Sequence, residues 1–461
     1  MSSLSRSRYS PPGSSPSPRP EISLATGAPS LLKRFTGGPY NHDRFHLPVL
    51  LYCAQPSSAG RHLPMLLYPA QLAPSKPTVV VCIPHPPCLN CDLIKGPGCS
   101  SLNYGAMQEL GPFRVHSDGK TLYRNKFAWN IGKGGSIICF TRAAANVLFL
   151  ESPAGVGFSY SNKTSDYSAS GDSKTATDNY VFLLNWLERF PEYKNRDFYI
   201  AGESYAGHYV PQLAHNILYN NKRANKTLIN LKGIIIGNAV INDETDNKGM
   251  YEYYATHALI SDETWYAIQK YCNFAPTGTD LASQCTSALI KADDDVSPID
   301  NYNIYAPLCF SSNLTSHPKK TNIMNFDPCG GHYVHAYLNR EDVQEALHAN
   351  VAKLHHEWQS CNDDIQKNWR DSPSTIIPLL QEVMSTGLRL WVYSGDTDAV
   401  VPVTSTQRSL SKMSLRTKSP WSPWFLGGEV RRLVCFHDID PFKLRTLDYP
   451  RRGINWLDLL N

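Results

Sequence analysis

A serine lies in the segment Gly-Glu-Ser-Tyr-Ala-Gly, residues 202–207, whose surroundings suit a nucleophile. The apolar run 198–201 precedes it, and a helical pattern reaching about Leu218 follows it. Small residues allow a sharp turn from strand to helix that holds a serine hydroxyl exposed above a sheet. The helix N-terminus favours developing negative charge, and the backbone N–H of Tyr205 would donate to the oxyanion. This placement predicts that Ser204 is a nucleophile rather than an ordinary turn residue.

A nucleophile on such a turn needs an acid and then a histidine later in the chain. Asp398 follows the apolar run 388–393 on a tight turn, and we predict that it is the acid. Asp396 on the same turn is the fallback, although it could equally cap the loop. His437 is the sole histidine after Asp398, so it is the candidate base.

Short apolar strands alternate with helices along the chain, which predicts an α/β fold with a mainly parallel sheet covered on both faces. The helical pattern over residues 173–190 has one apolar face and ends at Pro191. The predicted buried strands are 79–81, 147–150, 198–201, 231–236 and 388–393.

The periodicity of apolar residues divides the chain into three regions. Residues 1–60 are rich in Pro, Ser and Gly, lack periodicity and are predicted to be mostly disordered. Residues 61–461 then form one domain. Within it, residues from about 245 to 330 lose the strand–helix rhythm and are predicted to form an insertion or lid.

The composition limits the classes of partner. The 461 residues include 44 Lys and Arg against 40 Asp and Glu, a net charge of +4 that gives no electrostatic case for nucleic acid or acidic membranes. The apolar runs are too short to span a bilayer. Twelve cysteines together with three Asn-x-Ser/Thr sequons favour passage through the secretory pathway. Residues 1–20 have no apolar core and are therefore not a signal peptide.

Several segments resemble the serine carboxypeptidase family, most closely its plant members. The resemblance implies an α/β-hydrolase fold and release of C-terminal residues from peptides at acidic pH through an acyl-enzyme, without metal or organic cofactor. Some plant members are acyltransferases on glucose esters instead. The matching segments are GPGCSSLNYGAMQELGPFRV at 96–115, FLESPAGVGFSYSN at 149–162, FYIAGESYAGHYVPQLA at 198–214, GNAVIND at 237–243, YVHAYLNREDVQEALHAN at 333–350 and YSGDTDAVVP at 393–402.

The resemblance also implies roles for individual residues. Ser204 resembles the nucleophile and Asp398 the acid. The implied oxyanion donors are Gly96 and Tyr205, and the implied ligands of the substrate carboxylate are Glu109 and Glu203. Close carboxyls can share a proton, and a protonated carboxyl can donate to a carboxylate. Binding should therefore weaken as the pH rises and the shared proton leaves.

The family pattern further implies three disulfides, Cys99–Cys361, Cys272–Cys285 and Cys309–Cys329. The sequons make Asn162, Asn225 and Asn313 candidate glycosylation sites. The other cysteines lie where the sequence leaves the family, and Cys88-x-x-Cys91 lacks the second ligand pair of a zinc site, so we predict no metal. The remaining four are Cys53, Cys82, Cys139 and Cys435.

Four departures from the family concern the site. Ile94-Lys95-Gly96 replaces Asn-Gly-Gly, which removes a carboxylate ligand and a conformationally free glycine. Residues 131–143 look inserted, and after Val430 the family's histidine motif is missing, so His437 lies in an unrelated context. The fourth is the absence of a signal peptide. Such abrupt breaks are typical of retained introns or a shifted reading frame.

Three hypotheses follow. The chain is a serine carboxypeptidase acting on peptides, an acyltransferase on the same scaffold, or an inactive relative or mis-assembled gene model that folds poorly or only binds. Glu109 and Glu203 favour the first over the second, whereas the missing histidine motif favours the third. The resemblance implies an extracellular or vacuolar location, and a homodimer stays open.

Overall fold

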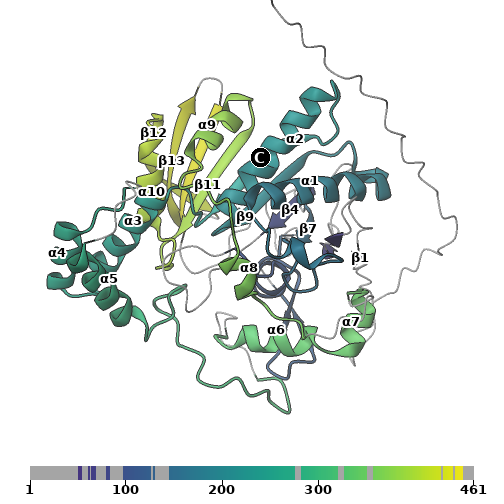
Figure 1. Ribbon diagram of the computed structural model, residues 1–461, viewed down its shortest axis with the longest axis horizontal. Helices are drawn as coiled ribbons and strands as arrows, with labels where there is room; N and C mark the ends of the chain where they lie inside the picture. The colour runs from purple at the N-terminus through teal and green to yellow at the C-terminus, as the bar shows by residue number, and fades with distance from the viewer. Residues whose placement is uncertain are drawn as a thin grey trace, which may run out of the picture. The chain divides into compact units, whose positions relative to one another are not determined.

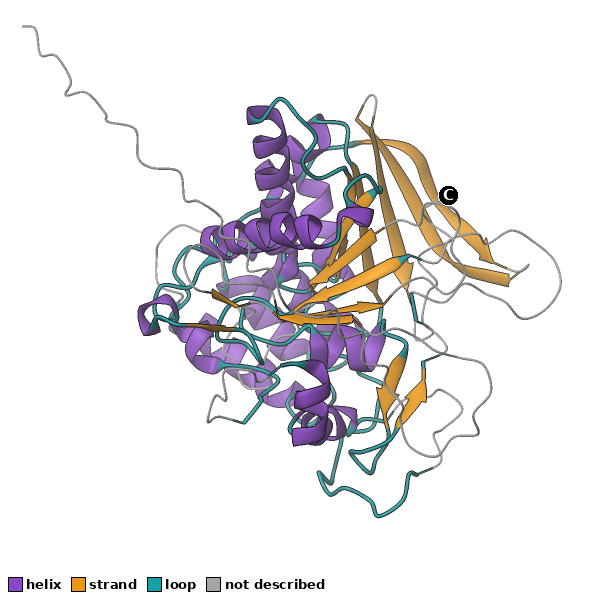
Figure 2. Ribbon diagram, turned by 90° about the vertical axis from the view of Figure 1, so that its right-hand side faces the viewer, coloured by secondary structure: helices purple, strands orange, loops and turns teal. Residues whose placement is uncertain are grey.

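A sheet of ten strands runs through the described part of the chain in the order β1-β3-β7-β4-β9-β10-β11-β14-β13-β12 (Figures 1 and 2). The computed structural model describes residues 50–53, 61–62, 64–68, 79–83, 97–125, 128–129, 145–275, 282–319, 327–349, 357–426, 429–439 and 442–449, with side chains between residues 97 and 417. The sheet strands are β1 (Leu50–Cys53), β3 (Pro64–Tyr68), β4 (Val79–Ile83), β7 (Asn146–Leu150), β9 (Phe198–Glu203), β10 (Leu231–Gly237), β11 (Arg389–Gly395), β12 (Arg416–Leu426), β13 (Glu429–Ile439) and β14 (Phe442–Tyr449).

The centre of the sheet is parallel and its two flanks are antiparallel. Strands β7, β4, β9, β10, β11 and β14 pair in parallel, whereas β1 and β3 on one side and β13 and β12 on the other pair antiparallel. The predicted mainly parallel sheet is therefore confirmed. Two short antiparallel pairs lie apart from it, β2 (Arg61–His62) with β8 (Tyr160–Ser161) and β5 (Phe113–Val115) with β6 (Leu122–Arg124).

Helices cover both faces of this sheet. Successive strand residues point to opposite faces, so Leu148 and Leu150 of β7 join the core under α1, α2 and α9, and Val147 and Phe149 join the core under η1, α6 and α7. Figure 1 shows α1 and α2 beside one another. The helices are η1 (Leu102–Glu109, a π-helix), η2 (Thr164–Asp166), α1 (Asp172–Arg189), η3 (Pro191–Tyr193), α2 (Ala206–Arg223), α3 (Asp243–Thr256), α4 (Asp262–Tyr271), α5 (Ser283–Val296), α6 (Gly330–Leu338), α7 (Glu341–Leu347), α8 (Asp363–Lys367), α9 (Ile377–Ser385) and α10 (Val403–Lys412).

The region predicted as an insertion or lid contains α3, α4 and α5, which share a core of their own. Tyr251 and Tyr253 of α3 are buried against Leu289 and Ala292 of α5. The disulfide Cys272–Cys285 joins the end of α4 to α5. The movement of a lid stays a prediction.

The structure differs from the sequence prediction at both flanks of the sheet. Within residues 1–60, Leu50–Cys53 form β1, because this apolar run finds a partner strand in Pro64–Tyr68. The rest of 1–60 lies outside the described residues. Beyond Arg416, three strands extend the sheet, and β12 contains Pro420 and Pro423. Proline is tolerated there because β12 is an edge strand, which leaves one row of backbone groups unpaired.

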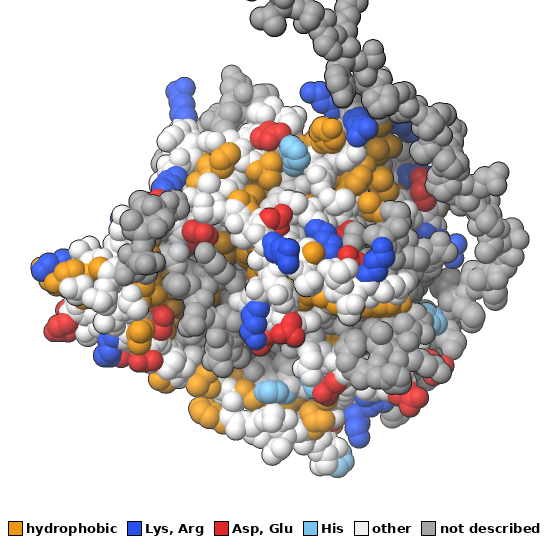
Figure 3. Space-filling view, viewed as in Figure 1, with side chains coloured by type: hydrophobic (Ala, Val, Ile, Leu, Met, Phe, Trp, Pro, Cys, Tyr) orange, Lys and Arg blue, Asp and Glu red, His pale blue; other side chains and the backbone are white. Residues whose placement is uncertain are grey.

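Charged side chains of both signs lie among each other on the face shown in Figure 3. This mixture agrees with the near balance of acidic and basic residues in the sequence. Every helix in the described part of the chain is too short or too polar to cross a membrane.

Candidate active site

The turn between β9 and α2 holds Ser204 in a strained backbone conformation. Its φ is 60°, a left-handed value that a non-glycine residue rarely adopts. Three backbone hydrogen bonds hold it there. The Ser204 N–H donates to the Gly237 carbonyl at 3.0 Å, and the Ser204 carbonyl accepts from Gly207 at 3.0 Å and Val240 at 2.9 Å. The structure therefore has the predicted turn, in which the strained Ser204 joins the end of β9 to the start of α2.

Gly207 lets α2 approach the next strand-to-helix connection closely. A Cβ atom on Gly207 would lie 2.3 Å from the Val240 carbonyl oxygen and 3.0 Å from the Cβ of Ala239. Both neighbours are fixed, one as backbone and one as a buried side chain. This position therefore requires glycine, whereas Ala206 one residue earlier is accommodated in the core.

Replacing Gly207 by alanine should lower the free energy of unfolding by about 1–3 kcal/mol, because the new methyl group has no space. The matched control is Gly331→Ala in α6, where the nearest atom to the added Cβ is the Gln108 Nε2 at 3.9 Å. That change should raise stability by up to about 1 kcal/mol through helix propensity. Urea unfolding of both variants measures the difference, and equal stabilities would contradict the close approach.

The candidate acid Asp398 lies on the loop that follows β11. Its carboxylate accepts backbone N–H groups from Val400 at 2.8 Å and Val401 at 3.4 Å, and it also interacts with Asn238. Burial raises the pKa of Asp398 to about 7 despite these donors, and Asp300 adds to the rise.

Asn238 fixes the acid loop to the end of β10. Its side-chain oxygen accepts from the Gly395 N–H at 2.8 Å, and its Nδ2 donates to the Val401 carbonyl at 3.0 Å. The Asn238 backbone has φ of 36°, which asparagine tolerates better than most residues. Asp396, the fallback acid, accepts the Tyr253 hydroxyl on its backbone carbonyl at 2.7 Å. The Asp398 carboxylate, by contrast, lies near enough to Glu203 to raise the pKa of Glu203.

Glu203 and Glu109 form a hydrogen-bonded pair of carboxyls beside Ser204. Burial raises the pKa of Glu203 well above its usual range, and the nearby charges of Glu109 and Asp398 raise it further. Burial also raises the pKa of Glu109, whereas the bond from Glu203 and the Arg114 charge lower it. Both carboxyls are therefore held above their ordinary pKa, and the pair can share one proton in the hydrogen bond between them. Neither residue is fully buried, so a ligand carboxylate could replace Glu109 as acceptor.

The candidate base His437 lies on β13, away from this edge of the sheet. In register it pairs with Leu444 of β14, which pairs in turn with Leu390 near the start of β11. A strand rises about 3.3 Å per residue, so Leu390 lies roughly 16 Å from the far end of β11, where Asp398 follows. Ser204 follows the same edge of β9. This register gives no support to His437 as the base.

The candidate oxyanion donor Gly96 lies outside the described residues, as do 94–95 and the apparent insertion 131–143. The residues that follow Gly96 are firmly held. Cys99 is bonded to Cys361, and the Ser100 N–H donates to the Ser360 carbonyl at 2.7 Å. The Ser100 hydroxyl donates to Glu151, whose pKa burial raises to about 7.

Three disulfides join the cysteine pairs that the family resemblance implies: Cys99–Cys361, Cys272–Cys285 and Cys309–Cys329. The first connects segments 262 residues apart in sequence. Cys53, Cys82 and Cys435 lie in strands β1, β4 and β13, and Cys88, Cys91 and Cys139 lie outside the described residues.

Two further predictions from the sequence concern glycosylation and metal binding. All three sequon asparagines, Asn162, Asn225 and Asn313, are exposed. Within the described ranges, no group of three or more His, Cys, Asp or Glu side chains is arranged to hold a metal.

Sequence reasoning missed a buried polar cluster directly behind the nucleophile turn. Asp172 and His208 are each 1% exposed and lie 3.0 Å apart between Oδ2 and Nδ1. His208 lies in the predicted helical stretch after Ser204, where a polar residue is ordinarily exposed, and Asp172 lies directly before the helix predicted over residues 173–190. The available signal was His208 itself, four residues after Ser204 on the helix that must pack against the sheet.

A family model described as serine carboxypeptidase matches residues 93–436. Serine carboxypeptidase-like 40 of Arabidopsis thaliana is 59% identical over 337 residues, which cover 73% of this chain and 64% of that protein. Serine carboxypeptidase 24 of the same plant is 46% identical over 360 residues, covering 75% and 74%. The chain thus spans less than two thirds of the first relative's length.

A solved structure shows the same fold. Kex1(delta)p, a prohormone-processing carboxypeptidase from Saccharomyces cerevisiae, superposes with a TM-score of 0.66 at 20% identity, covering 87% of this chain and 86% of that one. The likeness confirms the predicted α/β-hydrolase fold. The matched family region ends at residue 436, immediately before His437.

Proposed function

Because the chain belongs to the serine carboxypeptidase family, we propose that it binds peptides by their C-terminal carboxylate and releases the last residue through Ser204. The observation that carries this proposal is the Glu203–Glu109 pair, which presents a protonated carboxyl next to the strained serine. A carboxyl that keeps its proton can donate to a substrate carboxylate, whereas an ionised carboxyl would repel it. The site is therefore suited to free peptide C-termini at acidic pH.

The reaction would proceed through an acyl-enzyme. The Ser204 oxygen attacks the carbonyl carbon of the last peptide bond, and the negative charge on the carbonyl oxygen is met by the Tyr205 N–H at the start of α2. The peptide C–N bond breaks, and the released amino acid takes up a proton. Water then hydrolyses the ester on Ser204. Asp398 would orient and stabilise the group that accepts the serine proton.

A second candidate function is carboxylate binding without turnover. The register of β13 favours it, since it places His437 level with Leu390 at the other end of β11 from Asp398.

Peptides of one sequence, with a free or an amidated C-terminus, separate these functions. At pH 5 the free peptide should bind and the amidated peptide should not, as measured by calorimetry. Mass spectrometry then shows whether the last residue is released, which supports the carboxypeptidase, or retained, which supports binding alone. Equal affinity for both peptides would overturn carboxylate recognition altogether.

We also propose that the chain matures in the secretory pathway, outside the cell or in the vacuole. Three disulfides and three exposed sequon asparagines support this location, because disulfides persist in oxidising compartments. Digestion with a glycosidase of protein from its native tissue tests it, since a shift in mass would show glycans on Asn162, Asn225 or Asn313.

A further inference from the structure

The buried carboxylate of Asp172 accepts four hydrogen bonds from side chains. The Tyr205 hydroxyl and the Trp369 indole donate to Oδ1, each at 2.9 Å. The Gln212 amide donates to Oδ2 at 2.7 Å, and the Nδ1 of His208 lies 3.0 Å from the same oxygen. Burying a carboxylate to 1% exposure costs free energy unless hydrogen bonds compensate for the lost water. The loss of one donor should therefore weaken the positions of the others.

Three of the four donors come from one face of α2 and its first turn. Tyr205, His208 and Gln212 are spaced by three and four residues, the spacing at which side chains on a helix lie above one another. Tyr205 directly follows Ser204, and its ring stacks on His208 with centroids 4.9 Å apart. The Asp172 carboxylate at the start of α1 thus binds side chains from the first two turns of α2, the helix that follows the nucleophile.

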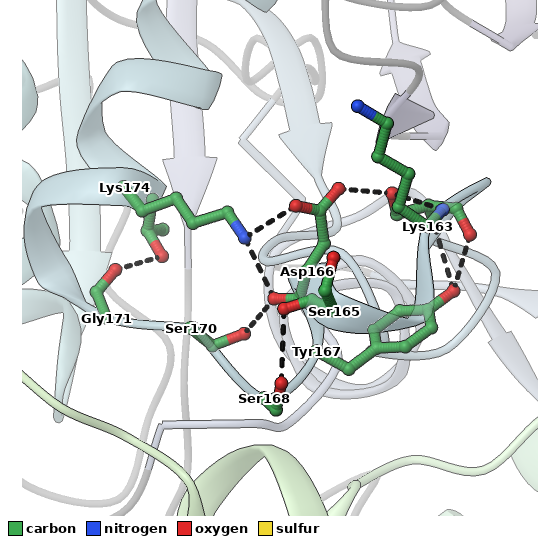
Figure 4. A network of polar contacts seen from close by, with 10 residues as sticks. Lys163, Ser165, Asp166, Tyr167, Ser168, Ser170, Gly171 and Lys174 are labelled. Atoms are coloured by element: carbon green, nitrogen blue, oxygen red, sulfur yellow. Dashed lines mark hydrogen bonds and ion pairs between the residues drawn. The ribbon is translucent and has the colours of Figure 1, made fainter.

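The loop that leads into α1 at Asp172 is held by a network of polar contacts around Asp166 (Figure 4). The Lys174 ammonium donates to the Asp166 carboxylate at 3.1 Å and to the Asp166 carbonyl at 2.8 Å. The Ser170 hydroxyl donates to that same carbonyl at 3.3 Å. These contacts hold the loop that leads into α1 at Asp172. The start of α1, and with it the Asp172 carboxylate, is therefore held in place where α2 packs against it.

His208 with Asp172 has the composition of a catalytic dyad, but its surroundings exclude the role of base for Ser204. The Nε2 of His208 is fully buried and, among the described residues, has no hydrogen-bond partner. The ring is covered by Tyr205 on one side. A substrate proton has no route to this nitrogen, so the pair acts on structure rather than on chemistry.

We propose that Asp172 is a positioning residue for the nucleophile turn, which it fixes through Tyr205, His208 and Gln212. The Ser204 backbone then keeps its strained conformation, and the Tyr205 N–H keeps its orientation, when the oxyanion forms. The catalytic part of this inference rests on the proposed function, whereas the mechanical part does not.

Amide hydrogen exchange of the full chain tests the mechanical part without requiring activity. In Asp172→Asn, the peptide covering residues 202–209 should exchange about tenfold faster, because an amide cannot accept all four bonds. Tyr205→Phe, which removes one hydroxyl and keeps the ring, should give an increase of about threefold. The matched control is Asp371→Asn, since Asp371 accepts the Ser173 N–H at the same end of α1 at 3.0 Å. It should leave residues 202–209 unchanged.

Unchanged exchange over 202–209 in both test variants, or an equal rise throughout the chain, would overturn the inference. Should Asp172→Asn fail to fold, Tyr205→Phe alone decides. Where the wild type releases the C-terminal residue, kcat should fall about tenfold in Asp172→Asn with KM unchanged. Faster local exchange in a chain whose wild type shows no turnover would reject the proposed catalysis and retain the positioning role.

Discussion

Replacing Ser204 by alanine should abolish labelling by a serine-directed fluorophosphonate, with a loss of at least about 10³-fold in rate. The probe reacts with an activated serine hydroxyl, and Ser204 is the serine that the β9–α2 turn holds at φ of 60°. The control is Ser168→Ala, which changes an exposed serine elsewhere and should leave labelling intact. Gel fluorescence of purified, folded protein measures the rate.

His437→Ala should leave the labelling rate unchanged, since the strand register keeps His437 away from Ser204. A large loss in this variant would show that the tail folds back to supply the base. Labelling that persists in Ser204→Ala would identify a different reactive serine. Wild-type protein that is folded and stays unlabelled would favour carboxylate binding without turnover.

The affinity for a peptide with a free C-terminus should fall about 10–100-fold between pH 5 and pH 8. Burial holds the pKa values of Glu203 and Glu109 above the ordinary value of 4.5, so the pair keeps its shared proton at pH 5. The peptide carboxylate is ionised throughout this range. As the pH rises through the raised pKa of the pair, the proton leaves and two carboxylates face the ligand, which weakens binding.

Glu203→Gln should remove most of this pH dependence. Its amide donates a hydrogen bond at every pH and carries no charge, so the variant should bind at least about tenfold more tightly than wild type at pH 8. The control Glu188→Gln alters an exposed residue of α1 and should follow the wild-type curve. Calorimetric titrations from pH 5 to pH 8 measure this. A flat wild-type curve, or parallel curves for wild type and Glu203→Gln, would contradict the shared proton.

The sequence and the strand register both argue against His437 as the base. The sequence places a single histidine after Asp398, outside the motif that the family uses. The structure adds that this histidine lies two strands away from β11 in the order of the sheet and level with the wrong end of it. Neither observation depends on the other.

Local features of the molecule could be predicted from the sequence. The helix predicted over residues 173–190 is α1, and the predicted strand and turn around Ser204 are β9 and the start of α2. These signals are short in range: the period of apolar residues, the bulk of proline and the small residues of a sharp turn. The edge strand β12 escaped prediction because Pro420 and Pro423 argue against a strand unless its place at an edge is known.

The contacts that make the site depend on the tertiary structure. Glu109 and Glu203 belong to η1 and β9, and sequence motifs suggested their pairing by family resemblance alone, while their shared proton follows from burial. The spacing of Tyr205, His208 and Gln212 places them on one helix face, but nothing in the sequence identifies Asp172 as their common partner. Sequence periodicity indicates which face of a helix or strand is apolar. Which side chains from distant segments meet depends on the order of the strands and the packing of the helices.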